Sequence, residues 1–155
     1  MPKQTITRKA ADNDYFHRDF HIALNYAIGY LHEHFGEEAV REYLVQFADA
    51  WYSPLKQAVL ENGLSAIKAH YENIYTLEAA EFDMQLSDEE LLIHLFASPA
   101  VVHIKSNGHA VSPLFHETVV TVNREICRDT PFACELLHYD ADNGGYRLRF
   151  FRRAT

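Results

Sequence analysis

The spacing of apolar residues changes near residue 80, and this change constrains the fold more than any other feature of the sequence. Before that point apolar residues recur every three or four positions, as on one side of a helix. The first such series is Phe16, Phe20, Ala23, Ala27 and Leu31. The stretch EFDMQLS, residues 81–87, instead alternates apolar and polar side chains, as a half-buried strand does. The chain therefore predicts helices first and strands later.

Capping residues divide the first half into four predicted helices. The first helix has possible N-caps at residues 12–14 and ends near His34. The inward face of the second is predicted to contain Val40, Tyr43, Leu44, Phe47 and Trp51. Ser53 and Pro54 predict the start of a third, because serine is a good N-cap and proline suits the first helical position. Gly63 separates the third helix from the fourth.

The second half predicts two β-hairpins separated by two helices. EFDMQLS and LLIHLFA form the first hairpin, and FACELLHYD and GYRLRFFRR, joined by DADNGG, form the second. Ser98-Pro99 and Ser112-Pro113 each predict a helix start, and the second of these helices should run to about Arg128. The predicted fold is α+β: N-terminal helices followed by an antiparallel four-stranded sheet with helices on one face.

Length and charge limit the organisation and the partners. With 155 residues, the chain predicts a flexible tail over residues 1–12 and a single domain over residues 13–155. A net charge of -8 makes nucleic acid an unexpected partner. We expect no membrane segment, because no apolar run is long enough. The two cysteines, Cys127 and Cys134, form no CxxC motif and are predicted to be reduced, so we expect a cytoplasmic protein.

The chain contains ten histidines, and histidine is both a common metal ligand and a proton carrier near neutral pH. His17 and His21 are four residues apart, which places them on one side of a helix and makes them candidate metal ligands. The alternative is that both are amphipathic side chains at the border of the buried stripe. No HExxH motif and no third ligand with recognisable spacing accompanies them.

A second group of candidates lies around the two Ser-Pro helix starts. His103 and the pair His116-Glu117 are candidate catalytic residues, with a histidine acting as general base toward water. Ser98 and Ser112 are candidate ligand-binding residues, because a helix N-terminus can hold a carboxylate. The alternative is that both histidines are surface positions on short helices.

Arginines on the last predicted strand could also hold a small carboxylate. Arg147, Arg149 and Arg153 are predicted to share one face of that strand, opposite Leu148 and Phe150. Arg147 and Arg149 are therefore candidate ligand-binding residues. The alternative is a solvated sheet face whose charges prevent aggregation.

The run DEELLIHLFASPAVVHIKSNGHAVSPLFHETVVTVNREI, followed by FACELLHYDADNGGYRLRFFRR, resembles the L-2-amino-thiazoline-4-carboxylic acid hydrolase-like family. In layout it is more distantly similar to ligand-binding domains of the vinyl-reductase type. The resemblance covers about Glu81 to Arg153. It implies a small heterocyclic or carboxylate ligand and hydrolytic ring opening at a C–N or C–S bond. A cysteine often precedes the proline of FASPAV in that family, whereas Ser98 stands there in this chain.

Three hypotheses follow. The first is a small hydrolase that opens a carboxylated heterocycle by general-base activation of water. The second is a sensory module that binds a small molecule or haem without chemistry, with His17, His21 or His94 as haem ligands. The third is a homodimer that buries a sheet face containing Leu137, Tyr139 and Phe151. The sequence does not fix a cofactor.

Overall fold

The computed structural model describes residues 18–155 and confirms the α+β fold. Along this part of the chain the elements are α1 (Asp19–Phe35), α2 (Glu37–Asn62), α3 (Leu64–Leu77), β1 (Phe82–Leu86), β2 (Glu90–Leu95), α4 (Pro99–Ser106), α5 (Glu117–Cys127), β3 (Phe132–Tyr139) and β4 (Tyr146–Arg152). The predicted tail, the predicted first N-cap and Phe16 lie outside the described residues.

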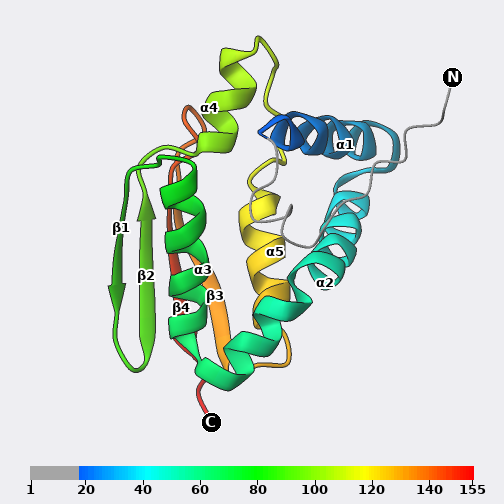
Figure 1. Ribbon diagram of the computed structural model, residues 1–155. Coiled ribbons are helices and arrows are strands. Elements are labelled where there is room, and N and C mark those ends of the chain that lie inside the picture. The colour runs from blue at the N-terminus through cyan, green and yellow to red at the C-terminus, as the bar shows by residue number, and fades with distance from the viewer. Residues whose placement is uncertain (1–17) are drawn as a thin grey trace, which may run out of the picture.

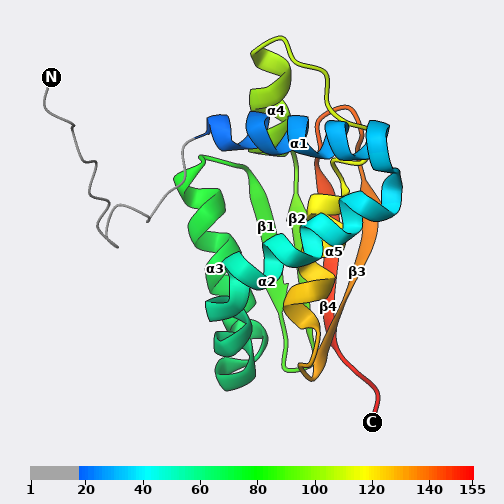
Figure 2. The ribbon, with the colours of Figure 1, turned by 90° about the vertical axis from the view of Figure 1, so that its right-hand side faces the viewer.

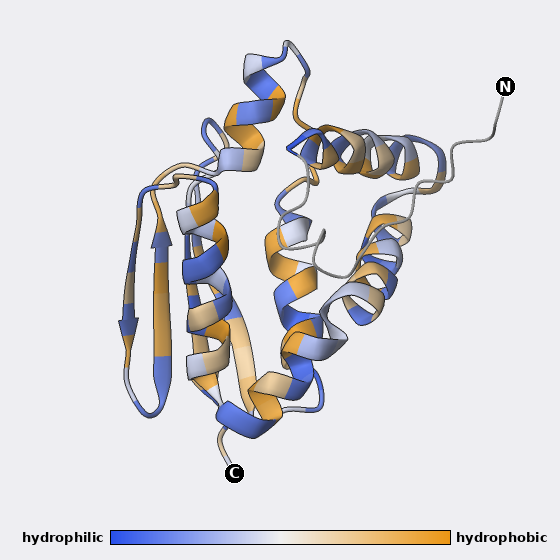
Figure 3. Ribbon diagram, in the orientation of Figure 1, coloured by the Kyte–Doolittle hydropathy of each residue, from blue (hydrophilic) through white to orange (hydrophobic). Residues whose placement is uncertain are grey.

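The two predicted hairpins are confirmed, and they join into one antiparallel sheet with the strand order β1-β2-β4-β3. One row across the sheet consists of Met84, Ile93, Leu148 and Leu136, each opposite its neighbour. Ile93 and Leu148 in the two central strands are buried, and β2 is predominantly hydrophobic (Figure 3). This apolar face anchors the core.

Helices cover that face in two layers. α3 and α5 lie along the sheet, and α2 packs on the outside of α5 (Figures 1 and 2). α1 crosses near the end of the sheet and contacts both α2 and α4. In the described part of the chain, no helix covers the opposite sheet face, so the prediction of helices on one face is confirmed.

A β-bulge interrupts the pairing of β3 with β4. The register shifts between Leu136 and His138, which leaves Leu137 as an extra residue. Beyond the bulge, His138 lies opposite Arg147 on the open face, and Tyr139 lies opposite Tyr146 on the helix side. The prediction that Tyr139 shares the open face with Leu137 and Phe151 is therefore wrong.

The prediction of a separate helix at Ser53-Pro54 is also wrong, because α2 continues through Pro54. Proline removes one helical hydrogen bond and crowds the preceding turn, but packing of the residues around it can outweigh that cost. In α2, Val40, Leu44, Ala48 and Val59 are buried on both sides of the proline. Trp51 was predicted to point inward, but 57% of its surface is exposed.

The two Ser-Pro sites of the second half differ from each other. α4 begins at Pro99 as predicted, and the Ser98 hydroxyl accepts a hydrogen bond from the Val101 N–H at 3.4 Å. The next helix was predicted to begin at Pro113, but α5 begins at Glu117. The segment 112–116 forms tight turns instead, in which the Phe115 N–H donates to the Ser112 carbonyl.

Cys127 and Cys134 are free thiols, in agreement with the sequence. Burial raises the pKa of Cys127 to about 12, so this thiol stays protonated and unreactive near neutral pH. Among the helices of residues 18–155, none has the length and apolar character needed to cross a bilayer.

Candidate functional site

A cavity of about 170 Å³ lies between the helices and one end of the sheet. It is lined by parts of α1, α2, α3 and α5, by the start of α4, and by the end of the second hairpin. Of the lining residues within 18–155, nine are Phe, Tyr or Trp: Phe20, Phe47, Trp51, Tyr52, Tyr71, Tyr75, Phe115, Tyr139 and Tyr146. A cavity of about 150 Å³ is large enough for benzene, so this one suits a ligand of about one ring.

The aromatic side chains of α1 and α2 support one another. Phe47 stacks with Phe20 at a centroid distance of 6.1 Å and with Trp51 at 6.4 Å. Tyr52 meets Phe47 edge to face at 6.1 Å. Such contacts restrict the rings, so this wall of the cavity is largely preformed.

Three tyrosine hydroxyls on the cavity wall are paired within the protein. Those of Tyr75 and Tyr146 share a hydrogen bond, and that of Tyr71 donates to Asn123 Oδ1 at 2.5 Å. Asn123 Nδ2 in turn donates to the Val119 carbonyl at 2.8 Å. Burial raises the pKa of all three tyrosines, so each hydroxyl stays protonated.

Two further tyrosines on the wall have hydroxyls with no hydrogen-bond partner within residues 18–155. They are Tyr52 on α2 and Tyr139 on β3. Burial raises the pKa of both, with smaller contributions from the carboxylates of Glu78 and Asp140 respectively. Both are therefore neutral groups that can donate a hydrogen bond to a ligand.

A buried, hydrogen-bonded histidine–glutamate pair completes the wall. His21 Nε2 on α1 lies 2.8 Å from Oε1 of Glu78, which follows α3 directly. Their side chains are only 11% and 5% exposed. Among the lining residues that the structure describes, Glu78 is the only Asp, Glu, Lys or Arg. The pair places a hydrogen-bonded carboxylate and an imidazole beside the cavity.

The structure does not assemble a metal site from the described residues. His17 lies outside them, and His21 is paired with Glu78. Within residues 18–155, no group of three His, Cys, Asp or Glu side chains could hold a metal ion. His94, a candidate haem ligand, lies on the open face of the sheet beside Arg147 and close to the Phe96 ring.

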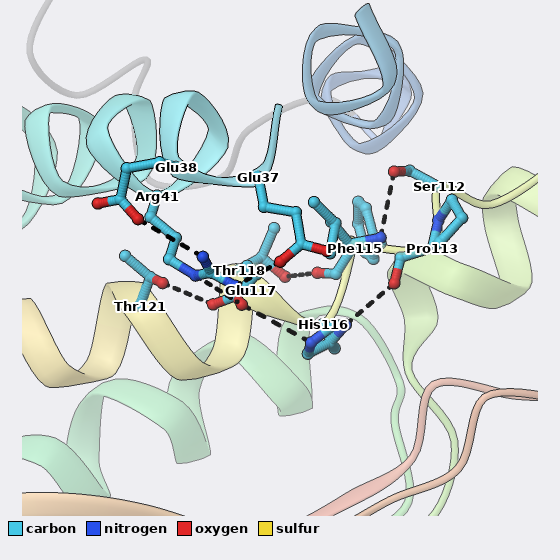
Figure 4. Close-up of polar contacts among 11 residues, drawn as sticks. Glu37, Glu38, Arg41, Ser112, Pro113, Phe115, His116, Glu117, Thr118 and Thr121 are labelled. Carbon is cyan, nitrogen blue, oxygen red and sulfur yellow. Dashed lines mark hydrogen bonds and ion pairs between the residues drawn. The ribbon is translucent and has the colours of Figure 1, made fainter. Parts of the chain in front are cut away.

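None of the predicted catalytic residues His103, His116 and Glu117 lines the cavity. His103 on α4 hydrogen-bonds to Asp19 at 3.1 Å. His116 Nδ1 lies 3.1 Å from the Pro113 carbonyl oxygen, and Nε2 lies 3.8 Å from Glu117. Figure 4 shows the Glu117 carboxylate between this histidine, Arg41 and Thr121. The Glu117 carboxylate therefore already makes structural contacts with Arg41 and Thr121. The catalytic roles of His103, His116 and Glu117 stay predictions.

Of the predicted ligand-binding residues, only Ser98 lines the cavity. The Ser112 hydroxyl accepts a hydrogen bond from the Leu114 N–H at 3.3 Å. Arg147 and Arg149 lie on the open face of the sheet, where Arg149 pairs with Glu90 and Glu135. The predicted carboxylate-binding cluster therefore does not surround the cavity.

Arg153 does not continue the arginine row. Its guanidinium donates to the carbonyls of Thr130 and Cys127 at 3.3 Å, beyond the end of β4. The prediction that three arginines share one face of the strand is therefore wrong for this residue.

Sequence reasoning missed most of the cavity wall. Tyr71 and Tyr75 recur at helical spacing, but such a pattern also describes an ordinary core. Glu78 gave one usable signal, because it is a single carboxylate within the otherwise uncharged segment NIYTLEAA, residues 73–80. Only the fold brings it to His21, 57 residues earlier.

Comparison with known proteins found no protein family that matches this chain and no curated relative.

Proposed function

We propose that this protein binds a small ring compound in the aromatic cavity. One observation carries the proposal: a preformed cavity of about 170 Å³ presents two unpaired tyrosine hydroxyls and a buried His–Glu pair among aromatic walls. Small-molecule sites are typically concave and mainly apolar, with a few polar groups that orient the ligand. The heterocycle implied by the family resemblance is of suitable size.

Filling the cavity should abolish binding. Val119 on α5 lines it, and Val119→Trp adds a bulky ring to that wall. Val102→Trp is a matched control, because Val102 lies on α4, is 49% exposed and does not line the cavity. We expect phenol and benzamide to raise the melting temperature of the wild type and of Val102→Trp, but not that of Val119→Trp.

Calorimetric titration checks the same comparison at constant temperature. Binding of phenol that is equally tight in the wild type and in Val119→Trp would place the ligand elsewhere. If neither compound binds the wild type at millimolar concentration, the proposal fails.

A second candidate function is hydrolysis of a carboxylated heterocycle in the same cavity, and the His21–Glu78 pair favours it. A carboxylate that accepts a hydrogen bond from a histidine fixes the tautomer of that histidine. It also stabilises the imidazolium that forms when the histidine acts as a general base and takes up a proton. His21 could then take a proton from the water that attacks the ring.

Incubation with 2-aminothiazoline-4-carboxylate tests this candidate, with mass spectrometry detecting addition of one water. Turnover should be lost in His21→Gln, and the effect of His116→Ala shows whether the His116-Glu117 pair contributes instead. If the wild type forms no product, the hydrolase candidate fails while the binding proposal stands.

A further inference from the structure

We propose that the cavity selects a cationic ring compound, with an amidinium or ammonium group placed beside Glu78. This inference rests on the proposed binding function and names the class of ligand. It departs from the carboxylate that the sequence suggested.

The first argument is the sign of the charge at the wall. Glu78 is 8% exposed, and within residues 18–155 no Lys or Arg lines the cavity. With Glu78 ionised, the His21–Glu78 pair is neutral when the imidazole is protonated and negative when it is not. In neither state does the pair attract an anion. Burial is the main cause of the raised pKa of Tyr52, and the negative charge of Glu78 is a second cause. The charge of Glu78 therefore acts on a hydroxyl of the cavity wall.

The second argument is the aromatic lining. The face of an aromatic ring carries negative electrostatic potential, so rings around a cavity attract a cation more than a neutral group of the same shape. The rings of Trp51 and Phe47 stack on α2, and the ring centroids of Tyr71 and Tyr75 on α3 lie 5.4 Å apart. A cation between these walls would be stabilised by both the rings and the carboxylate.

The third argument is that the start of α4 offers little to an anion. The start of α4 reaches the wall at Ser98 and Pro99, but proline has no N–H to donate. The next N–H groups include those of Val101 and Val102, which both donate to Ser98. Some of the N–H groups at the positive end of this helix therefore already have hydrogen-bond acceptors within the protein.

Benzamidine, benzamide and benzoate test the proposal, because they share one ring and differ mainly in charge. Titration calorimetry at pH 7.5 should show a Kd for benzamidine about tenfold or more below that for benzoate, with benzamide between them. Equal affinities, or a preference for benzoate, would overturn the charge selection and leave the binding function intact. If all three fail to bind, the binding function itself is lost.

Glu78→Gln tests the source of the selection, because it removes the charge and keeps the shape and a hydrogen-bond acceptor for His21. We expect affinity for benzamidine to fall about tenfold while that for benzamide changes little. Glu81→Gln removes the same charge from an exposed residue three positions away that does not line the cavity, and it should change neither.

If Glu78→Gln does not fold, Trp51→Leu provides a second variant at a side chain that is 57% exposed. Its loss of affinity should be larger for benzamidine than for benzamide. Equal losses for the two ligands, or an unchanged preference for benzamidine in Glu78→Gln, would overturn the proposal.

Discussion

His70 on α3 is a half-buried histidine with an unusual environment. Its ring meets those of Tyr52 and Tyr71 edge to face, at centroid distances of 5.6 and 5.1 Å. Its Nε2 has no hydrogen-bond partner within the described chain. Burial lowers the pKa of His70 to about 4, so the folded protein holds this ring neutral.

That pKa makes stability depend on pH. The unfolded chain takes up a proton at His70 below about pH 6.5, whereas the folded chain does so only near pH 4. Stability should therefore fall as the pH drops through this window. Between pH 7 and pH 5, the free energy of unfolding should decrease by about 2 kcal/mol because of this histidine alone.

His70→Phe should remove this dependence while keeping an aromatic ring between the two tyrosines. Urea unfolding at pH 7 and pH 5 measures the difference for the wild type and the variant. His138→Gln, on the exposed sheet face, should leave the difference unchanged. A wild-type loss between pH 7 and pH 5 that persists in His70→Phe would contradict the assignment.

Individual site residues were only partly predictable from the sequence. His21 was recognised as a candidate because its spacing from His17 placed both on one helix face, but its actual partner is Glu78. That pairing depends on how α1 packs near the end of α3, and a local pattern does not contain this information. Ser98 was recognised because a helix cap is a local feature, and it reaches the cavity.

At the scale of elements, the sequence predicted best where the stop signals were strong. Both hairpins and the start of α4 agree with their turn and capping residues. The starts predicted at Ser53 and Ser112 failed, although both use the same Ser-Pro pair. Packing on either side of Pro54 keeps α2 continuous, and the turns at 112–116 delay α5, so tertiary structure decided both cases.

Pro54 inside α2 should weaken the protein. We expect Pro54→Ala to raise the free energy of unfolding by roughly 1–3 kcal/mol, because it restores a helical N–H and relieves crowding in the preceding turn. Chemical denaturation measures the change. A destabilised variant would show that α2 needs a proline-specific geometry at this point.

The turn between β3 and β4 depends on Gly144. It has a φ of +72°, and an added Cβ would lie 2.4 Å from Val101 Cγ2 and 2.8 Å from Ser98 Cβ on α4. Gly144→Ala should destabilise the protein by about 2 kcal/mol or more, because both the backbone and the contact with α4 are unfavourable.

Gly29→Ala in α1 is the matched control, since an added Cβ there meets nothing within 4 Å. This variant should gain roughly 0.5–1 kcal/mol, because alanine favours a helix. Urea unfolding of both variants checks the pair. A Gly144→Ala protein as stable as the wild type would show that the turn can move away from α4.

At the scale of the whole molecule, the open sheet face is more polar than the sequence suggested. Arg149 pairs with Glu90 and Glu135 and stacks over Phe151 at 4.5 Å. Of the three residues predicted to form a dimer interface, only Leu137 is strongly exposed there, at 49%. The homodimer stays a prediction.

Light scattering tests it directly. If two copies of the chain pack together through the open sheet face, the wild type should show twice the mass of one chain. Leu137→Lys should then show the mass of a single chain. Leu60→Lys, at a residue on α2 that is 51% exposed, controls for the added charge. A wild type with the mass of one chain at micromolar concentration would contradict the dimer.

The β-bulge at Leu137 decides what the cavity receives from β3. Strand side chains alternate between faces, so regular pairing through Leu137, without the bulge, would exchange the faces of the two residues that follow. The imidazole of His138 would then replace the phenol of Tyr139 on the inner side, and a phenol would face solvent. The bulge thus determines whether this part of the cavity wall carries a second imidazole, in addition to that of His21, or keeps a neutral hydroxyl.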